Sequence, residues 1–211
     1  MVITKIELQK RNKDRASIYI DEEFAFGLHV NVVYDLGLKK GMEIDEDFKS
    51  TILAKEETKQ AHLYALKLVN YRPRCQSEVR RKMAEKGYAP EIIDETIDYL
   101  INYNFLNDEE FTRLYIESKI DINKYGFNRI RYQLGGMGIA RDIIDRCIAE
   151  YSDTTDEYPM ALSQAEKKVS SMSGDDYRSR YRKLSGFLGR KGYSYDVISK
   201  VLKEVLGDSN E

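Results

Sequence analysis

Residues 79–97 read VRRKMAEKGYAPEIIDETI, and the same arrangement returns as IRYQLGGMGIARDIIDRCI at 130–148 and as LSGFLGRKGYSYDVISKVL at 184–202. In each stretch one glycine separates two segments whose apolar residues recur every three or four positions. That period places the apolar residues on one face of a helix. Each stretch therefore predicts two amphipathic helices joined by a tight turn, and the threefold recurrence predicts a repeat protein.

The shared glycines are Gly87, Gly138 and Gly192, which lie 51 and 54 residues apart. We expect each to occupy the left-handed position that ends a helix, because a residue with a Cβ is strained there. Pro90 suits the first turn of the helix that follows in the first repeat. Ser194 suits the N-cap of the last helix.

A further helix is expected before each pair. Asn107 followed by Glu110 resembles a capping box, and Pro159 suits a helix start. The leading helices are predicted at Thr58–Asn70, Asp108–Ile122 and Met160–Met172. The expected fold is mostly α: three tandem three-helix repeats that stack into an elongated curved rod, because one repeat is too small to bury a core alone.

The first 45 residues differ from the rest. Residues 2–8, 16–20 and 24–28 alternate apolar and polar side chains or are β-branched, and polar turns separate them. This period-2 pattern predicts a small antiparallel β module, followed by a helical turn near 32–36 and a brief strand at 42–44. The expected domains are residues 1–45 for the β module and 46–104, 105–151 and 152–211 for the three repeats.

Composition limits the function classes. The 211 residues contain 34 Lys and Arg and 36 Asp and Glu, a net charge of −2, so the whole chain is not a basic coat for nucleic acid. Local basic faces remain compatible with that average. No apolar run approaches the roughly 18 residues of a membrane helix, and the first residues lack the order of a signal peptide. We therefore expect a cytoplasmic protein without a membrane partner.

Metal, cofactor and catalytic chemistry are not predicted. Cys75, Cys147, His29 and His62 are too scattered for a zinc site, and the cysteines are interpreted as buried small hydrophobes. Residues 135–138 lack the Lys-Ser/Thr of a P-loop and follow a helix. The acids at 108–110 suit a first helical turn. No Ser/His/Asp set is present, so an enzyme is not expected.

Several motifs in order resemble the RecX family of recombinase regulators. Residues 72–74, 77–79 and 83–88 resemble its first repeat, 103–111 resemble its connector between repeats, and 125–139 are similar to its second repeat. The likeness runs from about Lys59 to Leu206, and the β-rich N-terminus is similar to the extension of longer members.

The resemblance implies a non-enzymatic protein that binds RecA filaments on single-stranded DNA. Family members lodge in the filament groove and inhibit ATP hydrolysis, strand exchange and co-protease activity. The implied partners are the RecA filament and single-stranded and possibly duplex DNA, with this protein as a monomer and without a cofactor.

Residues 72–82 hold five cations and one acid, Glu78. The pairs Glu78–Lys82 and Arg81–Glu85 stand four residues apart and are expected on the helix surface. The remaining arginines, Arg72, Arg74 and Arg80, have no local acid. A solvated helix face is the ordinary interpretation, and the resemblance makes a face that contacts a partner or phosphate an equal alternative.

Residues 178–191 hold six cations and no acid. Asp176 stands four residues before Arg180, whereas Arg178 and Arg182 share a face and repel each other unless an anion lies nearby. The other side carries an apolar stripe, namely Tyr177, Tyr181, Leu184 and Leu188. We interpret the tyrosines as core-edge residues in preference to base-stacking platforms. This segment is the strongest candidate contact surface.

The candidate partner- or DNA-binding residues are Arg72, Arg74, Arg80, Arg81, Lys82, Arg129, Arg131, Arg178, Arg182, Lys183, Arg190 and Lys191. Two other functions stay open. One is a helical-repeat protein that binds nucleic acid on its own, and the other is an adaptor without DNA affinity.

Overall fold

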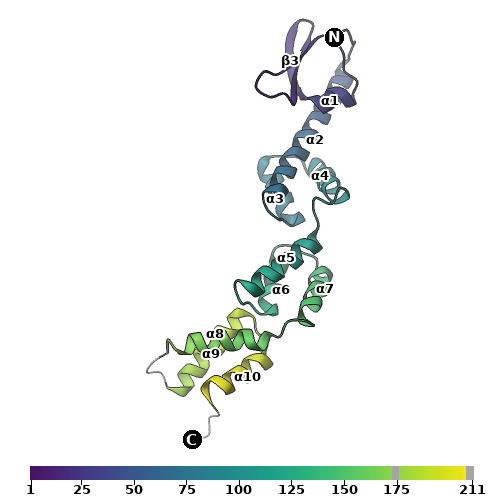
Figure 1. Cartoon of the computed structure of the whole chain (residues 1–211). Coiled ribbons are helices and arrows are strands. Elements are labelled where there is room, and N and C mark those ends of the chain that lie inside the picture. Colours follow the sequence, from purple (N-terminus) through teal and green to yellow (C-terminus); the bar gives the residue numbers. More distant parts are fainter. Residues whose placement is uncertain (173–175, 208–211) are drawn as a thin grey trace. The chain divides into compact units, whose positions relative to one another are not determined.

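The computed structural model describes residues 1–172 and 176–207 and is mostly helical, with a small sheet at the N-terminus (Figure 1). The strands are β1 (Ile3–Leu8), β2 (Arg15–Ile20) and β3 (Glu23–His29). The helices are α1 (Val30–Asp35), α2 (Glu46–Tyr71), α3 (Gln76–Lys86), α4 (Pro90–Asn102), α5 (Asp108–Asp121), α6 (Phe127–Gly136), α7 (Arg141–Ser152), α8 (Glu157–Val169), α9 (Tyr177–Lys191) and α10 (Tyr195–Leu206).

The chain forms two compact units. Unit 1 comprises Met1–Pro73 and Val79–Leu106, and unit 2 comprises Arg74–Glu78 and Asn107–Glu211. The β module and most of the first repeat thus belong to unit 1, whereas the second and third repeats belong to unit 2.

The predicted β meander is confirmed. The strands pair in the order β1-β2-β3, all antiparallel, and bury the alternating residues Ile3, Ile18 and Leu28. The prediction of a brief strand at residues 42–44 is wrong. A single bridge between Val2 and Glu43 stands there, because the chain meets β1 for too short a distance to form a ladder.

A buried ion pair joins α2 to the sheet. Glu56 is 9% exposed, and its carboxylate accepts hydrogen bonds from Arg15 Nη1 at 2.9 Å and from the His29 backbone N–H at 2.6 Å. Gln60 Nε2 donates a further bond at 2.8 Å. A buried carboxylate is costly without such partners, so these bonds fix α2 against the module.

The leading helix of the first repeat is longer than predicted. One helix of 26 residues, α2, spans the expected 58–70 and begins at Glu46, because the Asp45 side chain accepts the Phe48 N–H at 2.7 Å. Its later turns pack on α3 and α4 around a core of Ala61, Ala65, Val79, Met83, Ile93, Ile97, Leu100 and Leu106.

The leading helices of the second and third repeats start near the predicted residues. Asn107 caps α5 through the N–H groups of Glu109 and Glu110. The helix α8 begins at Glu157 and not at Met160, because Asp156 supplies the cap and Pro159 falls inside the first turn. Each of these helices covers its own apolar cluster, which includes Leu134 and Cys147 in the second repeat and Leu184 and Leu188 in the third.

The three turn glycines adopt the predicted left-handed conformation. Their φ angles are 96° at Gly87, 79° at Gly138 and 94° at Gly192. Pro90 occupies the start of α4, and the Ser194 hydroxyl accepts the Val197 N–H at 3.3 Å. Cys75 and Cys147 are buried and free, as expected.

Within unit 2 the turn of the third repeat docks on the start of α6. The Gly126 N–H donates to the Lys191 carbonyl at 2.9 Å, and the Asn128 N–H donates to the Gly192 carbonyl at 3.2 Å. A Cβ on Gly126 would lie 2.4 Å from the Gly192 oxygen. The two backbones therefore meet where no side chain fits.

The segment 74–78, at the start of α3, docks on the turn of the second repeat in the same way. Ser77 Oγ bonds the Met137 carbonyl, next to the Gly138 turn, and the Asp108 carboxylate accepts the Gln76 N–H at 2.8 Å. Glu157 repeats the role of Asp108, because its carboxylate accepts the Phe127 N–H at 2.6 Å. Burial raises the pKa of both carboxyls, and these backbone bonds oppose the rise.

We predict that Leu134→Ala lowers the free energy of unfolding by roughly 2–5 kcal/mol, because Leu134 is fully buried and its loss leaves a cavity. Thermal and urea unfolding measure the change. Tyr132→Ala on the same helix is the control, because Tyr132 is 82% exposed. Equal melting temperatures for the two variants would show that the core of this repeat is assigned wrongly.

We further predict that Gly126→Ala destabilises the protein by roughly 1–3 kcal/mol through overpacking at the junction. Gly135→Ala removes the same kind of residue from a helix, but its new Cβ meets nothing within 4 Å. That control is expected to be neutral or slightly stabilising. Urea unfolding distinguishes them, and a stable Gly126→Ala would contradict the close backbone contact.

Candidate functional site

The basic residues at the start of α3 have acidic partners. Arg74 pairs with Glu78, and Arg80 pairs with Asp94 on α4. The expectation that Arg74 and Arg80 lack acids is therefore wrong. Glu78 pairs with Arg74, four residues before it. The turn at Gly87 brings Asp94 to Arg80, and a search for pairs three or four residues apart does not find this contact.

The remaining cations of this segment are mostly paired too. Arg81 contacts Glu85 at 3.8 Å, as predicted, whereas Lys82 pairs with Glu85 at 2.7 Å and not with Glu78. Arg72 is exposed, and its guanidinium bonds the Pro73 carbonyl at 3.0 Å. The α3 surface is thus a mixed-charge face and not an uncompensated basic patch.

The second repeat copies one of these pairs. Arg131 Nε lies 3.1 Å from Asp145 Oδ1, and this arginine and aspartate stand 14 residues apart, as Arg80 and Asp94 do. The corresponding positions of the third repeat, counted from its turn glycine, are Ser185 and Ser199. The third repeat therefore lacks this ion pair between its second and third helices.

Arg129 and Lys191 hold the junction between the second and third repeats. Arg129 Nη1 donates to the Arg190 carbonyl at 2.7 Å, and Lys191 Nζ donates to the Asn123 carbonyl at 2.9 Å. Both cations also lie over the Tyr125 ring, at 4.0 and 5.2 Å from its centroid. These two candidate residues therefore stabilise the contact between the second and third repeats.

Burial and the nearby Arg129 guanidinium lower the pKa of Lys191. The two side chains have carbonyl and aromatic partners but no carboxylate among the described residues, and they repel each other. Their neighbour Arg190 is exposed, with its guanidinium folded back toward Gly186. Three cations, Arg129, Arg190 and Lys191, therefore lie at this junction.

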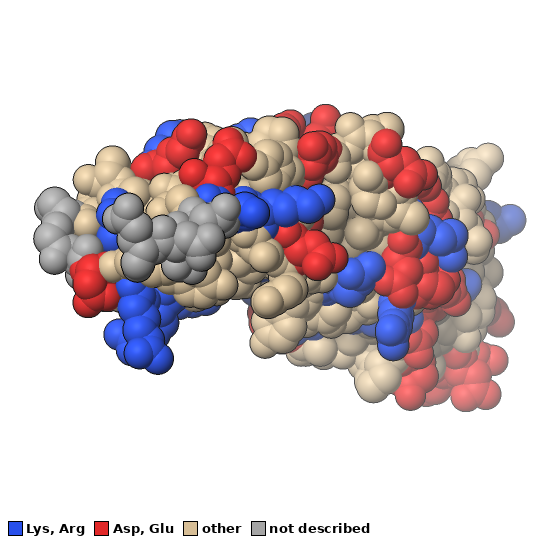
Figure 2. Space-filling view, turned by 90° about the horizontal axis from the view of Figure 1, so that it is seen from below, with Lys and Arg blue, Asp and Glu red and all other residues tan. Residues whose placement is uncertain are grey.

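The outer face of α9 carries the least compensated cations. Arg178 and Arg182 are exposed, as predicted, and neither forms an ion pair with any described residue. They stand one helical turn apart and repel each other, and no carboxylate of the described residues pairs with either. Lys183, also exposed, has a partner. Figure 2 shows a group of Lys and Arg side chains projecting at one end of the visible face.

Two tyrosines flank these arginines. Tyr177 and Tyr181 are each 41% exposed, and their ring centroids lie 6.3 Å apart. Leu184 and Leu188 are buried as predicted, whereas each tyrosine is only partly exposed. The Asp176 carboxylate caps the helix through the Ser179 N–H, and the Arg180 Nε is buried without a hydrogen-bond partner among the described residues.

Glycines continue the arginine stripe toward the end of α9. Gly189 has open space around it, and the Gly186 surface is approached by the Arg190 guanidinium. The open space around Gly189 leaves backbone accessible near the C-terminal end of α9. An exposed cation pair, two exposed rings and open backbone together suit an extended anionic chain.

The acids at 108–110 have structural partners. Asp108 caps α3, and Glu109 joins Arg113 and Arg146 in an ion-pair network that includes Glu150 at 2.8 Å from Arg113. These bonds lower the pKa of Glu109. Among residues 1–172 and 176–207, no group of three or more possible ligands gathers as a metal site. No helix in the same ranges has the length and apolarity needed to cross a membrane.

Comparison with known proteins covers both units. The RecX N-terminal domain matches residues 1–45, and the first, second and third three-helix domains of RecX match residues 61–100, 107–148 and 155–202.

Curated relatives named regulatory protein RecX align over nearly the full length. That of Clostridium acetobutylicum is 36% identical over 99% of this chain and 98% of its own. That of Clostridioides difficile is 34% identical over 97% of this chain and 96% of its own.

Two solved structures are also similar. A crystal structure of regulatory protein RecX has a TM-score of 0.83 at 26% identity and covers 95% of this chain and 98% of its own. RecX from Lactobacillus salivarius has a TM-score of 0.65 at 26% identity and covers 72% of this chain and 97% of its own. Sequence, repeat order and fold agree, and the chain belongs to the RecX family of regulatory proteins.

Proposed function

We propose that this protein binds RecA filaments on single-stranded DNA and inhibits their ATP hydrolysis, strand exchange and co-protease activity. In this proposal it acts in the cytoplasm as a monomer, without a cofactor and without catalysis of its own. Family membership supports the regulatory role, and the helical repeats offer several surfaces that can engage successive recombinase subunits. Simultaneous contacts raise avidity beyond that of one repeat.

The outer face of α9 carries the proposal. Arg178 and Arg182 are exposed cations without an ion-pair partner among the described residues, and the Tyr177–Tyr181 pair lies beside them. Bringing an anion to this face relieves a repulsion that the described residues leave in place. The filament supplies such anions as DNA phosphates or as carboxylates of the recombinase.

The direct experiment is DNA-stimulated ATP hydrolysis by the cognate RecA, with this protein titrated from substoichiometric to stoichiometric amounts. Binding to bare single-stranded DNA is measured in parallel. Inhibition at concentrations well below those that bind bare DNA supports recognition of the filament. Absence of inhibition up to stoichiometry contradicts the proposal.

We predict that the double change Arg178→Glu and Arg182→Glu weakens inhibition by about tenfold or more, because two attractive contacts become repulsive. Thermal unfolding should be unchanged, since both side chains are exposed and two glutamates repel each other as two arginines do. The control is Lys10→Glu with Lys13→Glu in the β1–β2 turn, which alters the net charge equally. Equal inhibition by wild type and the α9 variant would exclude this face.

The second candidate function is nucleic-acid binding independent of RecA, and the same face of α9 favours it. We predict that affinity for single-stranded DNA then falls with salt with a log–log slope of about −0.7 per phosphate contact. The α9 double variant should flatten that slope by one to two contacts. DNA affinity that is unmeasurable at low salt, together with strong inhibition, would favour an adaptor that contacts only the recombinase.

A further inference from the structure

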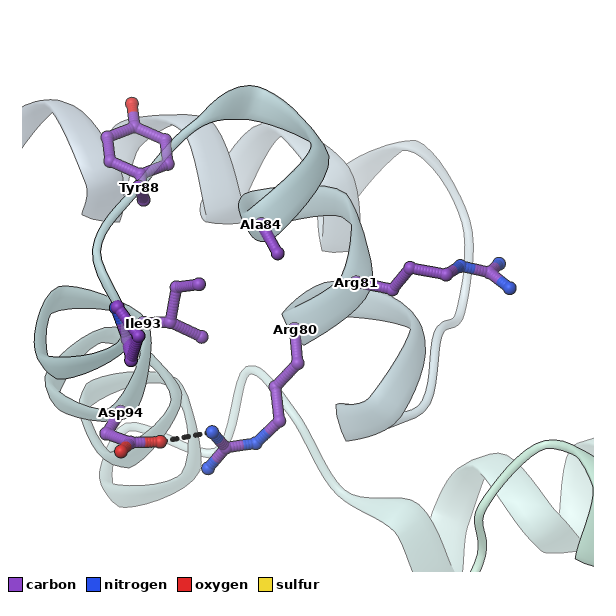
Figure 3. A pocket seen from close by; sticks show the side chains of 7 residues that line it. Arg80, Arg81, Ala84, Tyr88, Ile93 and Asp94 are labelled. Atoms are coloured by element: carbon purple, nitrogen blue, oxygen red, sulfur yellow. Dashed lines mark hydrogen bonds and ion pairs between the residues drawn. The ribbon is translucent and has the colours of Figure 1, made fainter.

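An open hollow of about 360 Å³ lies between α3 and α4 in the first repeat. Its apolar lining comes from Ala84 on α3 and from Pro90 and Ile93 on α4. Figure 3 shows Tyr88 at one end of the hollow and the Arg80–Asp94 ion pair at the other. The site thus combines an apolar wall with a guanidinium at its edge.

The ion pair at this edge is exchangeable. The side chains of Arg80 and Asp94 are 42% and 63% exposed, and solvent-exposed pairs contribute little to stability. A guanidinium has five N–H donors, and Arg80 uses Nη1 for Asp94. Donors therefore remain for an incoming carboxylate, or become free when Asp94 swings into solvent.

Arg81 strengthens the positive side of the hollow. It points away from Asp94 in Figure 3, and its carboxylate contact, Glu85 at 3.8 Å, is held more closely by Lys82 at 2.7 Å. The charged residues that line the hollow, two arginines and one aspartate, carry a net charge of +1. An acidic group is thus attracted to the α3 side.

We propose that this hollow binds a protein segment in which an aspartate or glutamate stands next to an aliphatic residue. The carboxylate replaces Asp94 at Arg80, and the aliphatic side chain packs on Ala84 and Ile93. Asp94 is then an intramolecular substitute for the partner's carboxylate. This inference rests on the proposed function in taking the recombinase as the source of the segment.

A nucleic-acid strand fits this hollow less well than such a peptide. The exposed side of α4 carries four acids, Glu91, Asp94, Glu95 and Asp98. A sugar–phosphate backbone presents one charge per nucleotide and would run past all of them, whereas a single carboxylate can stay on the α3 side. The apolar wall also has no counterpart in a phosphate chain.

The first repeat is better suited to this exchange than the second. There the equivalent aspartate, Asp145, lies within 3.1 Å of Arg131 and 3.6 Å of Arg141, so two guanidinium groups hold one carboxylate. Asp94 has Arg80 alone among the ion pairs of the described residues. The carboxylate that must move aside is therefore less strongly held in the first repeat.

Methyl NMR of the full chain tests the chemistry without the recombinase. The probes are N-acetyl-Leu-Glu-amide and N-acetyl-Leu-Gln-amide, titrated to millimolar concentrations while the Ala84 and Ile93 methyl signals are followed. The acidic probe is expected to shift both signals saturably and to bind several-fold more tightly than its uncharged match. Equal binding of the two probes, or no shift with either, overturns the proposal.

Variants test the same site on the filament. Asp94→Asn should tighten binding by about two- to fivefold, because Arg80 loses a weak competitor. Ala84→Trp should weaken it by about tenfold, because the indole fills the hollow. The controls are Asp98→Asn and Ala54→Trp, which change an exposed acid and an exposed alanine outside the lining.

Wild-type binding separates the two proposals. If wild type inhibits the filament and both test variants behave like their controls, the docking site is wrong and the proposed function stands. If wild type neither binds nor inhibits the filament, the proposed function is wrong, and the recombinase is not the source of the segment that the hollow binds. The NMR titration then decides alone whether the hollow takes an acidic–aliphatic segment.

Discussion

The left-handed glycine turn is the constraint on which the helical part of this protein depends. A helix that ends at Gly87, Gly138 or Gly192 reverses sharply, so the next helix returns along its apolar face and the two share one core. A residue with a Cβ would be strained at these φ angles. Gly192 also has a second reason to be glycine, because a Cβ there would lie within 3 Å of the Arg129 backbone and Cβ.

The turns also explain how adjoining repeats in unit 2 cohere. A helix that ends leaves carbonyl groups without partners, and a helix that begins leaves N–H groups without partners. At the junction of the second and third repeats these groups satisfy each other, through Gly126 to Lys191 and Asn128 to Gly192. Polar backbone ends, and not only apolar burial, therefore decide where one repeat meets the next.

This arrangement determines which cations stay available for partners. Arg129 and Lys191 neutralise the partial negative charge of carbonyls at the junction and pack on Tyr125. They therefore stabilise the fold, which a count of basic residues does not reveal. On α9, by contrast, Arg178 and Arg182 face outward with no described ion-pair partner. Sequence clusters of cations thus divide into those that hold the fold and those that face solvent.

Most of the fold was predictable because its signals are local. The period of the apolar residues, the turn glycines and the caps at Asn107 and Ser194 all act within one or two helical turns, and each appears where the sequence places it. The brief strand at 42–44 was predicted wrongly because strand formation depends on a ladder with β1, which the local pattern does not report.

The sites were less predictable because their pairings are not local. Glu56 meets Arg15 across 41 residues, and Arg80 meets Asp94 only because a turn folds α4 back on α3. The second of these left a signal, since Arg131 and Asp145 repeat its spacing. Comparing charges between aligned repeats, and not only apolar residues, would have found the pair.

That comparison also shows how one architecture can carry surfaces of different charge. Two repeats join their second and third helices through an arginine–aspartate ion pair, and in the first repeat an apolar wall lies beside that pair. The third repeat has Ser185 and Ser199 at those positions and places its unpaired arginines on the outer face of α9 instead. The paired edge suits a protein segment that brings one carboxylate, whereas the unpaired face suits a chain of many anions. The difference comes from four side-chain positions, 178, 182, 185 and 199, on a shared backbone, so selection can alter what a repeat recognises without altering how it folds.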